Sequence, residues 1–435
     1  MMRDRLRDEV VELTRALIRV DTSNPPGNET PAAELVAGYL REAGVEHELI
    51  GPDPERLNLV ARIPGRGDGP SLMLMAHTDV VPAPDAGWTV PPFDGALLDG
   101  RVVGRGANDM KSELAARAVA MAALARASEP PPGDVVLVAE ADEERGTSDV
   151  GMSWLVRNRS DLRCDFALNE GGGLALELAD GRRVVTISVG EKQVTSLRLR
   201  AFGRAGHASV PAAADNPLHH AARAVDRLLS FQAAAQRTPA LERALGVLGA
   251  SPGGGEEAIA GAAARHPALA DRLPAMARMT VTPTGLQTSE PANVIPPYAD
   301  VICDCRALPG QTVADIREHV DRALGDDVRY ELELLEPLTG GTESQLETEL
   351  YGVCDAYVAE RLPGATMLPI VSAGFSDSYW VREAHGTVAY GFAPVFSTDP
   401  GTYLDGAHGA DECIDVADLV EMARFHHHAA RAMRR

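Results

Sequence analysis

The chain has 435 residues, 45% of them hydrophobic and 24% charged, which is the composition of a globular protein too long for one ordinary hydrophobic core. No run of about 18 apolar residues is present, so the sequence argues against a transmembrane helix. The formal net charge of −22 disfavours nucleic acid and anionic membranes as partners, because both carry negative charge and would repel the chain.

The chain begins with MMRDRLRDEVVELTRALIRV, which mixes charged and apolar residues at short intervals. A secretory signal peptide requires an uninterrupted apolar core, so this stretch predicts an amphipathic helix and a cytoplasmic protein. The cysteines are odd in number and scattered, which predicts neither a disulfide framework nor a thiolate zinc site. They are Cys164, Cys303, Cys305, Cys354 and Cys413.

The next elements follow an α/β rhythm. Two short apolar runs, SLMLMA at 71–76 and DVVLVAEA at 134–141, are typical of buried strands. Between them, the Ala-rich and periodic stretch at 112–127 predicts a long helix. Strand, helix and strand in this order predict a mostly parallel sheet covered by helices. In such sheets, functional groups collect just beyond the carboxyl ends of the strands.

The middle of the chain predicts a second domain of different architecture. Alternating polar and apolar residues indicate half-exposed strands, and Thr312 stands where the N-cap of a helix is expected. The order β-α-β-β-α-β is the ferredoxin-like pattern, interrupted by a Gly/Pro/Ala-rich stretch at about 233–275. We therefore expect this domain to span 192–337 and to be inserted into a first domain formed by 1–191 and 338–435.

Polar residues follow the predicted strands. His77 and Asp79 come directly after the strand at 71–76, and in extended geometry their side chains point to the same side. His77 is either a hydrogen-bonded residue at a strand end or a metal ligand that Asp79 orients from behind. Asp109, after the glycines of GRGANDMK, is either an ordinary acidic residue at a helix N-terminus or part of the same site. That loop lacks the third glycine of a dinucleotide-binding motif, so nucleotide binding is rejected there.

Further carboxylates and a second histidine recur in similar places. The strand at the end of DVVLVAEA runs into Asp142, Glu143 and Glu144. A short apolar run ends at Glu170, and His408 lies in a Gly-rich loop. Adjacent carboxylates after a buried strand repel one another unless a cation offsets their charge. Two histidines and at least three carboxylates, with no thiolate, form a ligand set suited to a pair of divalent ions, zinc first, with cobalt or manganese as alternatives.

Eight stretches carry a family resemblance: HTDVVP, GRGANDMK, DEERG, LNEGG, GRAGHASVP, NVIP, DCRALPG and GAHGADE. In this order they resemble the signatures of the M20 metallopeptidase family, which comprises co-catalytic zinc carboxypeptidases, aminoacylases and succinyl-diaminopimelate desuccinylases. The resemblance covers nearly the whole chain. It implies a zinc-peptidase-type α/β catalytic domain with an inserted ferredoxin-like α+β lid domain, in agreement with the segmentation above, and a homodimer formed through the lid.

The resemblance also implies roles for the metal-site residues. Asp109 would bridge the two metal ions. His77 and Glu170 would complete one metal site, and Glu144 and His408 would complete the other. No metal or catalytic position departs from the family pattern, so an active enzyme is expected rather than an inactive homologue.

The implied chemistry is amide hydrolysis by a metal-bridged hydroxide. A water between two divalent ions has a lowered pKa, so hydroxide exists near neutral pH and can attack an amide carbonyl. Glu143 would act as the general base that takes the proton and then passes it to the leaving amine. Asp79 would orient His77 in this arrangement.

Four residues outside the metal site are implied as contacts of the substrate. His207 would polarise the scissile carbonyl, and in dimeric members such a histidine reaches the partner's active site, whereas composition alone favours an ordinary turn histidine. Asn293 would contact the same oxygen. Arg306 would grip a substrate carboxylate, with a surface charge at a strand end as the alternative. Gly374, in SAGFSDSYW, would offer a backbone contact.

The sequence thus predicts a hydrolase that cleaves an amide bond in a small peptide or N-acyl amino acid with a free carboxylate. Carboxypeptidase and aminoacylase activities are nearly balanced, although PANVIPPYADVICDCRALPG looks more like those two branches than the desuccinylase branch. The alternative from another class is a non-catalytic peptide- or metal-binding protein that keeps the fold. A serine or cysteine hydrolase has little support, because the sequence contains no G-x-S-x-G motif and no cysteine in a nucleophile's setting.

Overall fold

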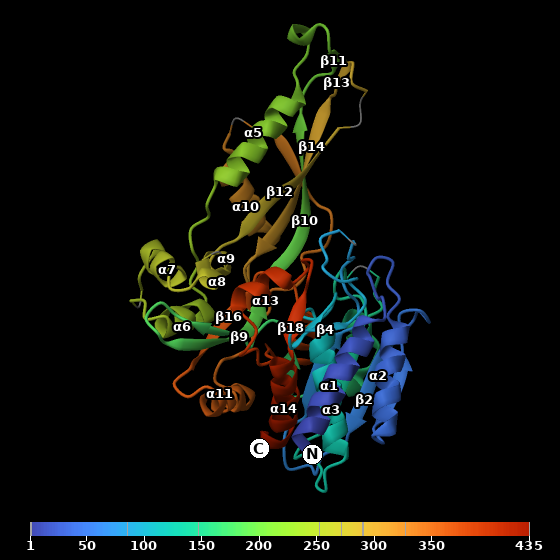
Figure 1. The fold of residues 1–435 in the computed structure, drawn as a ribbon. Helices are drawn as coiled ribbons and strands as arrows, with labels where there is room; N and C mark the ends of the chain where they lie inside the picture. Colours follow the sequence, from blue (N-terminus) through green and yellow to red (C-terminus); the bar gives the residue numbers. More distant parts are fainter. Residues whose placement is uncertain are drawn as a thin grey trace.

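The computed structural model describes residues 2–84, 86–146, 148–251, 253–270, 272–288, 291–326 and 328–434. Figure 1 shows an elongated molecule, in which a narrow sheet with two helices projects from a broad α/β body. Both chain termini lie at the end of the body that faces away from the projecting part. Within the described residues, no helix combines the length and the apolar character that crossing a bilayer requires.

A nine-stranded mixed sheet forms the centre of the body. Its strands are Glu46–Ile50 (β1), Asn58–Ile63 (β2), Leu72–His77 (β3), Val135–Glu140 (β6), Phe166–Asn169 (β7), Ala175–Glu177 (β8), Arg183–Glu191 (β9), Thr366–Ser372 (β16) and Val388–Gly391 (β17). They follow the order β1-β2-β6-β3-β7-β17-β9-β16, with β8 paired to β9. β6, β3, β7 and β17 run parallel, whereas β2 is antiparallel to β6. The predicted parallel arrangement is confirmed at the centre of the sheet.

The side chains of β3 show that this sheet is buried on both faces. Leu74 and Ala76 belong to the larger hydrophobic core of the body, whereas Met73 and Met75 belong to a smaller core on the opposite face. Successive side chains of a strand point to opposite faces, so an apolar residue at every position requires a covering layer on each side.

Helices supply both layers. The larger core lies under α1 (Met2–Ile18), α3 (Lys111–Ala125) and α14 (Val416–Ala432), and the smaller core under α4 (Met152–Asn158) and α12 (Ser378–His385). The larger core also includes side chains of α2 (Thr30–Glu42) and α11 (Glu349–Arg361). α3 is buried along most of its length, because its many alanines let neighbouring elements pack closely on every side.

The projecting part, which we call the lid, is a four-stranded antiparallel sheet covered on one face by two helices. Its strands are Gln193–Phe202 (β10), Thr280–Gln287 (β12), Tyr298–Ala307 (β14) and Tyr330–Leu334 (β15), in the order β12-β14-β10-β15. Its helices are α5 (Pro217–Ser230) and α10 (Val313–Leu324), which enclose a separate small core. The predicted ferredoxin-like order is confirmed, and Thr312 caps α10 through a capping box.

Two small sheets complete the structure. β11 (Gly206–His207) and β13 (Val294–Ile295) pair at the far tip of the lid (Figure 1). On the body, a three-stranded sheet contains β4 (Ala96–Leu98), β5 (Arg101–Val103) and β18 (Cys413–Asp415), and β18 follows α13 (Pro400–Gly406).

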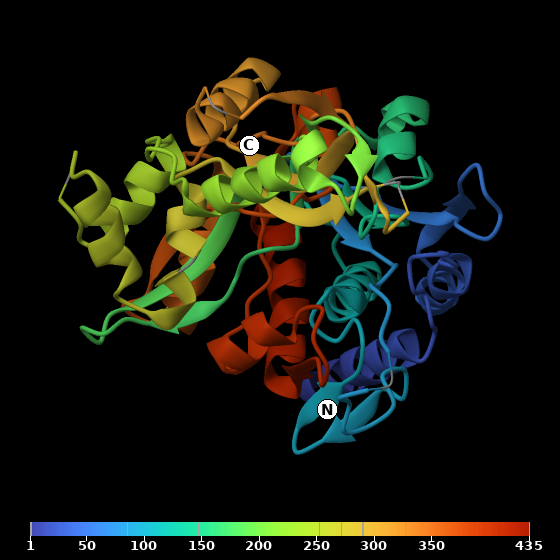
Figure 2. The ribbon, with the colours of Figure 1, turned by 90° about the horizontal axis from the view of Figure 1, so that it is seen from above.

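The Gly/Pro/Ala-rich stretch at 233–275 contains helices that were not predicted. They are α6 (Pro239–Val247), α7 (Glu256–Ala263), α8 (Pro267–Ala270) and α9 (Arg272–Met276), which we call the helical insert. Its buried apolar side chains belong to the larger core of the body rather than to the core of the lid, and α6 packs against β16. In Figure 2 the helical insert, in yellow-green, lies on the opposite side of the body from α2. The domain boundaries at 192–337 stay a prediction, since part of that span folds onto the body.

A single residue, Lys192, joins the body to the lid where β9 ends at Glu191 and β10 begins at Gln193. The Lys192 side chain is buried, and its Nζ donates hydrogen bonds to the backbone carbonyls of Ala275 at 3.2 Å and Arg278 at 2.8 Å. These carbonyls lie within and just beyond α9. The junction between body and lid is therefore fastened to the end of the helical insert.

Candidate metal centre

Five predicted ligand residues meet at one edge of the main sheet. His77 is the last residue of β3, Glu170 follows β7, and Glu144 lies in the loop after β6. Because these three strands are parallel neighbours, their carboxyl ends open at the same edge. Asp109 reaches this edge just before α3, and His408 reaches it from the loop between α13 and β18. The topology therefore brings together residues that lie far apart in the sequence.

The five side chains form two groups of three that share Asp109, and the ligand atoms of each group lie within 4.8 Å of one another. In the first group, His77 Nε2 lies 3.0 Å from Asp109 Oδ1 and 3.7 Å from Glu170 Oε2. In the second, His408 Nε2 lies 3.2 Å from Asp109 Oδ2 and 3.2 Å from Glu144 Oε2. Asp109 thus presents one oxygen to each imidazole, as a bridging ligand must. The grouping matches the predicted one, and the ligand roles stay predictions.

The electrostatics of the two groups favour positive charge between the side chains. Hydrogen bonds with Asp109 and Glu144 raise the pKa of His408 to about 10. Burial lowers the pKa of His77, but its contacts with Asp109 and other carboxylates raise it well above the ordinary value. Glu144 Oε1 is buried without a hydrogen-bond partner in the described part of the chain. Imidazole nitrogens and carboxylate oxygens in such a field suit divalent cations such as zinc, so the residues present fit the implied metal pair.

Asp79 contacts both His77 and the loop at 142–144, which we call the acidic loop. His77 Nδ1 donates to the backbone carbonyl of Asp79 at 3.0 Å, whereas Oδ1 of the Asp79 carboxylate is 3.5 Å away. With the proton on Nδ1, the lone pair of Nε2 is available to a cation. The Asp79 carboxylate accepts hydrogen bonds from the backbone N–H groups of Glu143 at 3.2 Å and Glu144 at 3.1 Å. Asp79 therefore fixes the imidazole chiefly through its carbonyl and the loop through its carboxylate.

A buried polar network behind Asp79 was not identified from the sequence. Asn24 Nδ2 donates to Asp79 Oδ2 at 2.9 Å and to Asp142 Oδ1 at 2.8 Å. Arg56 Nη2 donates to the same Asp142 oxygen at 3.0 Å and pairs with Glu29. All five residues are buried. Asn24 lies in SNPPGNE, a composition typical of a turn, which gives no sign of an amide directed at two carboxylates.

Glu412 is a second residue that the sequence reasoning missed. Its buried carboxylate accepts hydrogen bonds from the backbone N–H groups of Gly106 at 3.0 Å, Asn108 at 2.6 Å and Asp109 at 2.9 Å. It also pairs with Arg105 at 2.6 Å. These donors fix the turn that presents Asp109 to both imidazoles. The available sequence signal was its place in GAHGADE, four residues after the predicted ligand His408.

Glu143, the predicted general base, lies beside Glu144 in the loop after β6 and is half-buried. Burial and the nearby Glu170 carboxylate raise the pKa of Glu143 well above its ordinary value. A carboxylate with a raised pKa is a stronger base, which suits a residue that accepts a proton from water and releases it again. The catalytic role of Glu143 stays a prediction.

The predicted lid residues His207 and Asn293 lie together at the tip of the lid. Next to His207, the backbone N–H of Ala208 donates to the carbonyl of Asn293 at 3.0 Å. His207 Nδ1 accepts a hydrogen bond from the backbone N–H of Ser209 at 3.1 Å, so the neutral imidazole carries its proton on Nε2. Figure 1 places β11 and β13 at the end of the lid opposite the body, and the metal-ligand residues of the same chain belong to the body.

The other two predicted contacts of the substrate occupy different places. Arg306 lies on β14, where its guanidinium donates to the carboxylate of Asp304 at 2.9 and 3.0 Å. Within the described residues, the structure places no contact between Arg306 and the metal-ligand side chains. Gly374 lies in the loop after β16, and its backbone N–H donates to Ser372 Oγ at 3.2 Å. Ser372 lines a cavity that also reaches Asp109.

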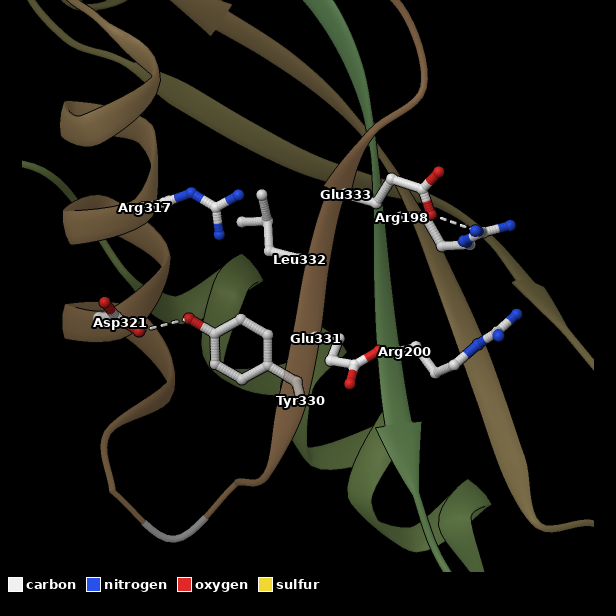
Figure 3. Close-up of a pocket in the computed structure, with 8 residues that line it drawn as sticks. All are labelled: Arg198, Arg200, Arg317, Asp321, Tyr330, Glu331, Leu332 and Glu333. Carbon is white, nitrogen blue, oxygen red and sulfur yellow. Dashed lines mark hydrogen bonds and ion pairs between the residues drawn. The ribbon is translucent and has the colours of Figure 1, made fainter.

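A hollow of about 430 Å³ on the lid is lined by side chains of β10, β15 and α10 (Figure 3). Arg198 pairs there with Glu333 across β10 and β15. The hydroxyl of Tyr330 donates to Asp321 Oδ1 at 2.5 Å. None of the five metal-ligand residues lines this hollow, so it is a separate feature of the lid.

Comparison with known proteins gives matches along nearly the whole chain. The sequence model of peptidase family M20/M25/M40 matches residues 73–432. A succinyl-diaminopimelate desuccinylase from Rhodospirillum centenum is 29% identical over 437 residues, which cover 96% of this chain and 95% of that protein. The N-fatty-acyl-amino acid synthase/hydrolase PM20D1 from Mus musculus is 27% identical, and the match covers 96% of this chain and 86% of that protein.

A solved structure shares the architecture. The M20 family metallo-carboxypeptidase Sso-CP2 from Sulfolobus solfataricus aligns with a TM-score of 0.72 and 18% identity, covering 97% of this chain and 98% of that chain. At this identity the likeness shows the fold, a mixed-sheet body with an antiparallel lid. The two relatives above have nearly equal identities to this chain, so identity alone does not favour one branch of the resemblance.

Proposed function

The chain belongs to peptidase family M20/M25/M40, and from this membership we propose that it hydrolyses an amide bond in a small N-acyl amino acid or peptide with a free carboxylate. The observation that carries the proposal is Asp109, whose two carboxylate oxygens lie 3.0 Å from His77 and 3.2 Å from His408. Glu143, a half-buried carboxylate, stands in the adjoining loop. A site for two cations beside a base has the parts that metal-assisted amide hydrolysis requires.

The proposed cofactor is a pair of divalent metal ions, zinc first, with cobalt or manganese as alternatives. His77 and Glu170 would hold one ion, Glu144 and His408 the other, and Asp109 would lie between them. Such ions, when bound, lower the pKa of water and polarise a carbonyl group.

Glu143 moves the proton in this proposal. It accepts a proton from the attacking water and donates it to the nitrogen of the leaving amine, so the amine departs uncharged. The raised pKa of Glu143 supports both transfers, because burial and the neighbouring carboxylates make its protonated form accessible. Asp79 holds the backbone of Glu143 at 3.2 Å, and Asn24 holds Asp79 at 2.9 Å.

His207 is proposed to act on a substrate held by a second copy of the chain. The tip of the lid lies away from its own metal-ligand residues, which favours donation of the Nε2 proton to a carbonyl in the partner subunit (Figure 1). A donor aimed at that oxygen stabilises the negative charge that develops on it. Asn293, beside His207, is the proposed second contact. The proposed assembly is therefore a homodimer formed through the lid.

Arg306 is the proposed partner of the substrate carboxylate, and Gly374 a proposed backbone contact. The guanidinium of Arg306 already holds the carboxylate of Asp304 with two donors, the geometry that a substrate carboxylate would adopt in its place. The names of both curated relatives refer to acyl groups on amino compounds. We therefore place N-acyl amino acids first among the substrates to be tested.

A substrate panel on the metal-loaded protein tests the proposal. N-acetyl amino acids, N-succinyl amino acids and dipeptides would be assayed after reconstitution with zinc, cobalt or manganese, and bound metal would be measured by mass spectrometry. The expected result is turnover of at least one substrate class with two ions bound per chain. Two bound ions without turnover on the whole panel would favour a non-catalytic peptide- or metal-binding protein.

Replacing Glu143 by alanine separates catalysis from metal binding. We expect Glu143→Ala to keep both ions, because Glu143 is not among the grouped ligand side chains. We expect kcat to fall about 10²- to 10⁴-fold, the usual contribution of a general base. Steady-state kinetics and metal analysis measure both effects. Glu177→Ala, which removes an exposed carboxylate of β8, is the control, and an unchanged kcat in Glu143→Ala would contradict the assigned role.

A further inference from the structure

A cavity of about 220 Å³ adjoins the candidate metal centre, because Asp109 and Glu170 form part of its wall. Most of the remaining wall is apolar and comes from β8, β16, α13 and the helical insert. The buried apolar side chains that line it include Leu174, Leu176, Leu269, Leu273, Met276 and Val371. The cavity therefore has a charged end, at the metal-ligand residues, and a wall that is otherwise mostly apolar.

The helical insert contributes part of the wall of this cavity. Leu269 on α8 and Leu273 and Met276 on α9 line it, and each exposes 3% or less of its surface. These side chains are buried because the helical insert folds onto the body.

The outer end of the cavity leads to the surface. Ala268, Arg272 and Leu404 line the cavity and also line a neighbouring surface hollow of about 580 Å³. Arg272 is exposed, and Asp405 on the wall of the hollow interacts with its charge. The charge of Arg272 therefore lies at the outer end of the cavity, where the cavity meets the surface hollow.

The other charged residues of the lining belong to the metal end. Asp109 and Glu170 are candidate ligands, and Glu113 lies close enough for both carboxylates to raise its pKa, although burial is the larger cause. Between the two ends the wall is mainly apolar. Burying a charge there would be costly, so neither the ammonium group of a peptide nor an α-carboxylate suits this space.

An N-acyl amino acid has one uncharged half, the acyl group, and that half is bonded directly to the scissile carbonyl. With the carbonyl at the metal centre and the carboxylate at Arg306, as the proposed function has them, the acyl chain is the part left to enter the cavity. An uncharged aliphatic chain matches the apolar wall, and its burial contributes favourably with every methylene.

We propose that this cavity binds the acyl chain of the substrate and that the enzyme prefers medium-length aliphatic N-acyl amino acids to N-acetyl amino acids and to peptides with a free N-terminus. The inference rests on the proposed function. A volume of about 220 Å³, against roughly 30 Å³ for a water-sized group, has room for about seven heavy atoms. This is the chain of an octanoyl group beyond its carbonyl. Longer chains pass Ala268 and Leu404 into the surface hollow.

A chain-length series tests the preference. N-acetyl-, N-butanoyl-, N-hexanoyl-, N-octanoyl- and N-decanoylglycine would be assayed with the metal-loaded enzyme, since glycine has no side chain that could enter the cavity instead. We expect kcat/KM to rise about fourfold for each methylene that becomes buried. The rise is expected to level off near the octanoyl compound. A flat or falling series would overturn the inference.

N-succinylglycine distinguishes an uncharged chain from one that ends in a carboxylate. The inference expects it to be cleaved more slowly than N-butanoylglycine, because its carboxylate would enter the apolar part of the cavity. The reverse order, with a succinyl advantage that disappears in Arg272→Gln, would assign the cavity to acidic acyl groups and overturn the proposal.

Substitutions at the outer end change the cavity in opposite directions. Ala268→Phe narrows it, and we expect the octanoyl-to-acetyl ratio of kcat/KM to fall about tenfold or more, since the end of the chain loses its burial. Leu404→Ala widens the same place and is expected to move the plateau to longer chains. Ala260→Phe, at an exposed position of α7, is the matched control and should leave the ratio unchanged. An unchanged ratio in all three folded variants would overturn the assignment.

Binding measurements keep this inference separable from the proposed function. If no N-acylglycine and no dipeptide is hydrolysed, the proposed function fails, but isothermal titration calorimetry still compares N-octanoylglycine with N-acetylglycine on the same protein. Tighter binding of the octanoyl compound in the wild type that is lost in Ala268→Phe would support an acyl site. Equal binding of the two compounds would overturn it.

Discussion

At the scale of single residues, Asn24 supports the candidate metal centre although it lies in a stretch with the composition of an ordinary turn. Its amide lies between the buried carboxylates of Asp79 and Asp142 and donates to both, at 2.9 and 2.8 Å. Asp79 in turn holds the backbone of Glu143. A neutral side chain thus gives two buried carboxylates a shared hydrogen-bond donor and supports the loop that carries the proposed base.

Asn24→Ala should weaken the metal centre without removing a ligand. The two carboxylates would lose their shared donor and repel one another, so the acidic loop would shift. We expect zinc affinity or kcat to fall about 10- to 100-fold, the usual effect of losing a partner behind metal ligands. Zinc competition and kinetics measure the change. Asn28→Ala, at an exposed position of the same stretch, is the control, and wild-type values in Asn24→Ala would argue against the network.

The sequence predicted the residues of the site better than their supports. His77 and Glu170 could be found because polar residues after buried strands are conspicuous, and the carboxyl ends of parallel strands converge. Glu412 could not be found, because its contribution is a set of hydrogen bonds to a turn 303 positions earlier in the chain. Composition and periodicity do not indicate which buried carboxylate accepts from which backbone N–H group.

At the scale of elements, a partly buried cluster joins α11 to α14, with Glu421 buried and Arg361 exposed. The Glu421 carboxylate on α14 accepts hydrogen bonds from Tyr357 Oη at 2.8 Å and from Arg361 Nε and Nη2 at 2.5 and 2.9 Å. Burial raises the pKa of Glu421, but the hydrogen bonds with Arg361 and Tyr357 outweigh it, so the pKa in the folded protein lies below the ordinary value.

This cluster should make the stability depend on pH. A group whose pKa is depressed by folding stabilises the fold above its unfolded pKa, and this stabilisation is lost as the pH falls through the folded pKa. We expect Glu421→Gln to lower the free energy of unfolding by about 1–3 kcal/mol at pH 7. Below the ordinary glutamate pKa of about 4.3 the difference should shrink.

Urea unfolding of both proteins at pH 7 and pH 4 measures the difference. Glu360→Gln, which changes an exposed glutamate of α11, is the control. A loss of stability in Glu421→Gln that stays the same at both pH values would show that the charge of Glu421 is not the cause.

The prediction of helices is correct where the apolar periodicity extends over many residues, and it misses helices where that periodicity is interrupted. The Ala-rich α3 and the capped α10 were recognised from unbroken patterns. In the helical insert, Leu241 and Leu245 have helical spacing, but the helices there are only four to nine residues long, and a stretch rich in glycine separates α6 from α7. Such pieces are too short to give a periodic signal, so the sequence does not predict them.

At the scale of the whole molecule, the inserted lid was predicted from the order of its elements, because β-α-β-β-α-β is the ferredoxin-like pattern even when another segment interrupts it. The place of the helical insert was not predicted. Its alanines and leucines could be buried equally well in either core, and sequence alone does not say which surface they meet. The structure places them on the body.

A mixing experiment tests whether His207 acts across the dimer. His207→Ala and Glu143→Ala would each be inactive alone. If His207 acts in the partner subunit, a mixed dimer contains one intact site, so random exchange of equal amounts should restore about a quarter of wild-type activity. Activity of the mixture against that of each variant is the measurement. No recovery, with subunit exchange verified by labelled chains, would mean that His207 does not act across the dimer.

The join at Lys192 has a mechanical consequence. The lid is attached to the body through one residue on this strand, and the ammonium group of that residue holds the carbonyls of Ala275 and Arg278 at the end of α9. The same helix, α9, contributes Leu273 and Met276 to the wall of the cavity. We therefore expect a rotation of the lid at Lys192 to displace α9 and change the width of the cavity, and a ligand that fills the cavity to restrain the lid.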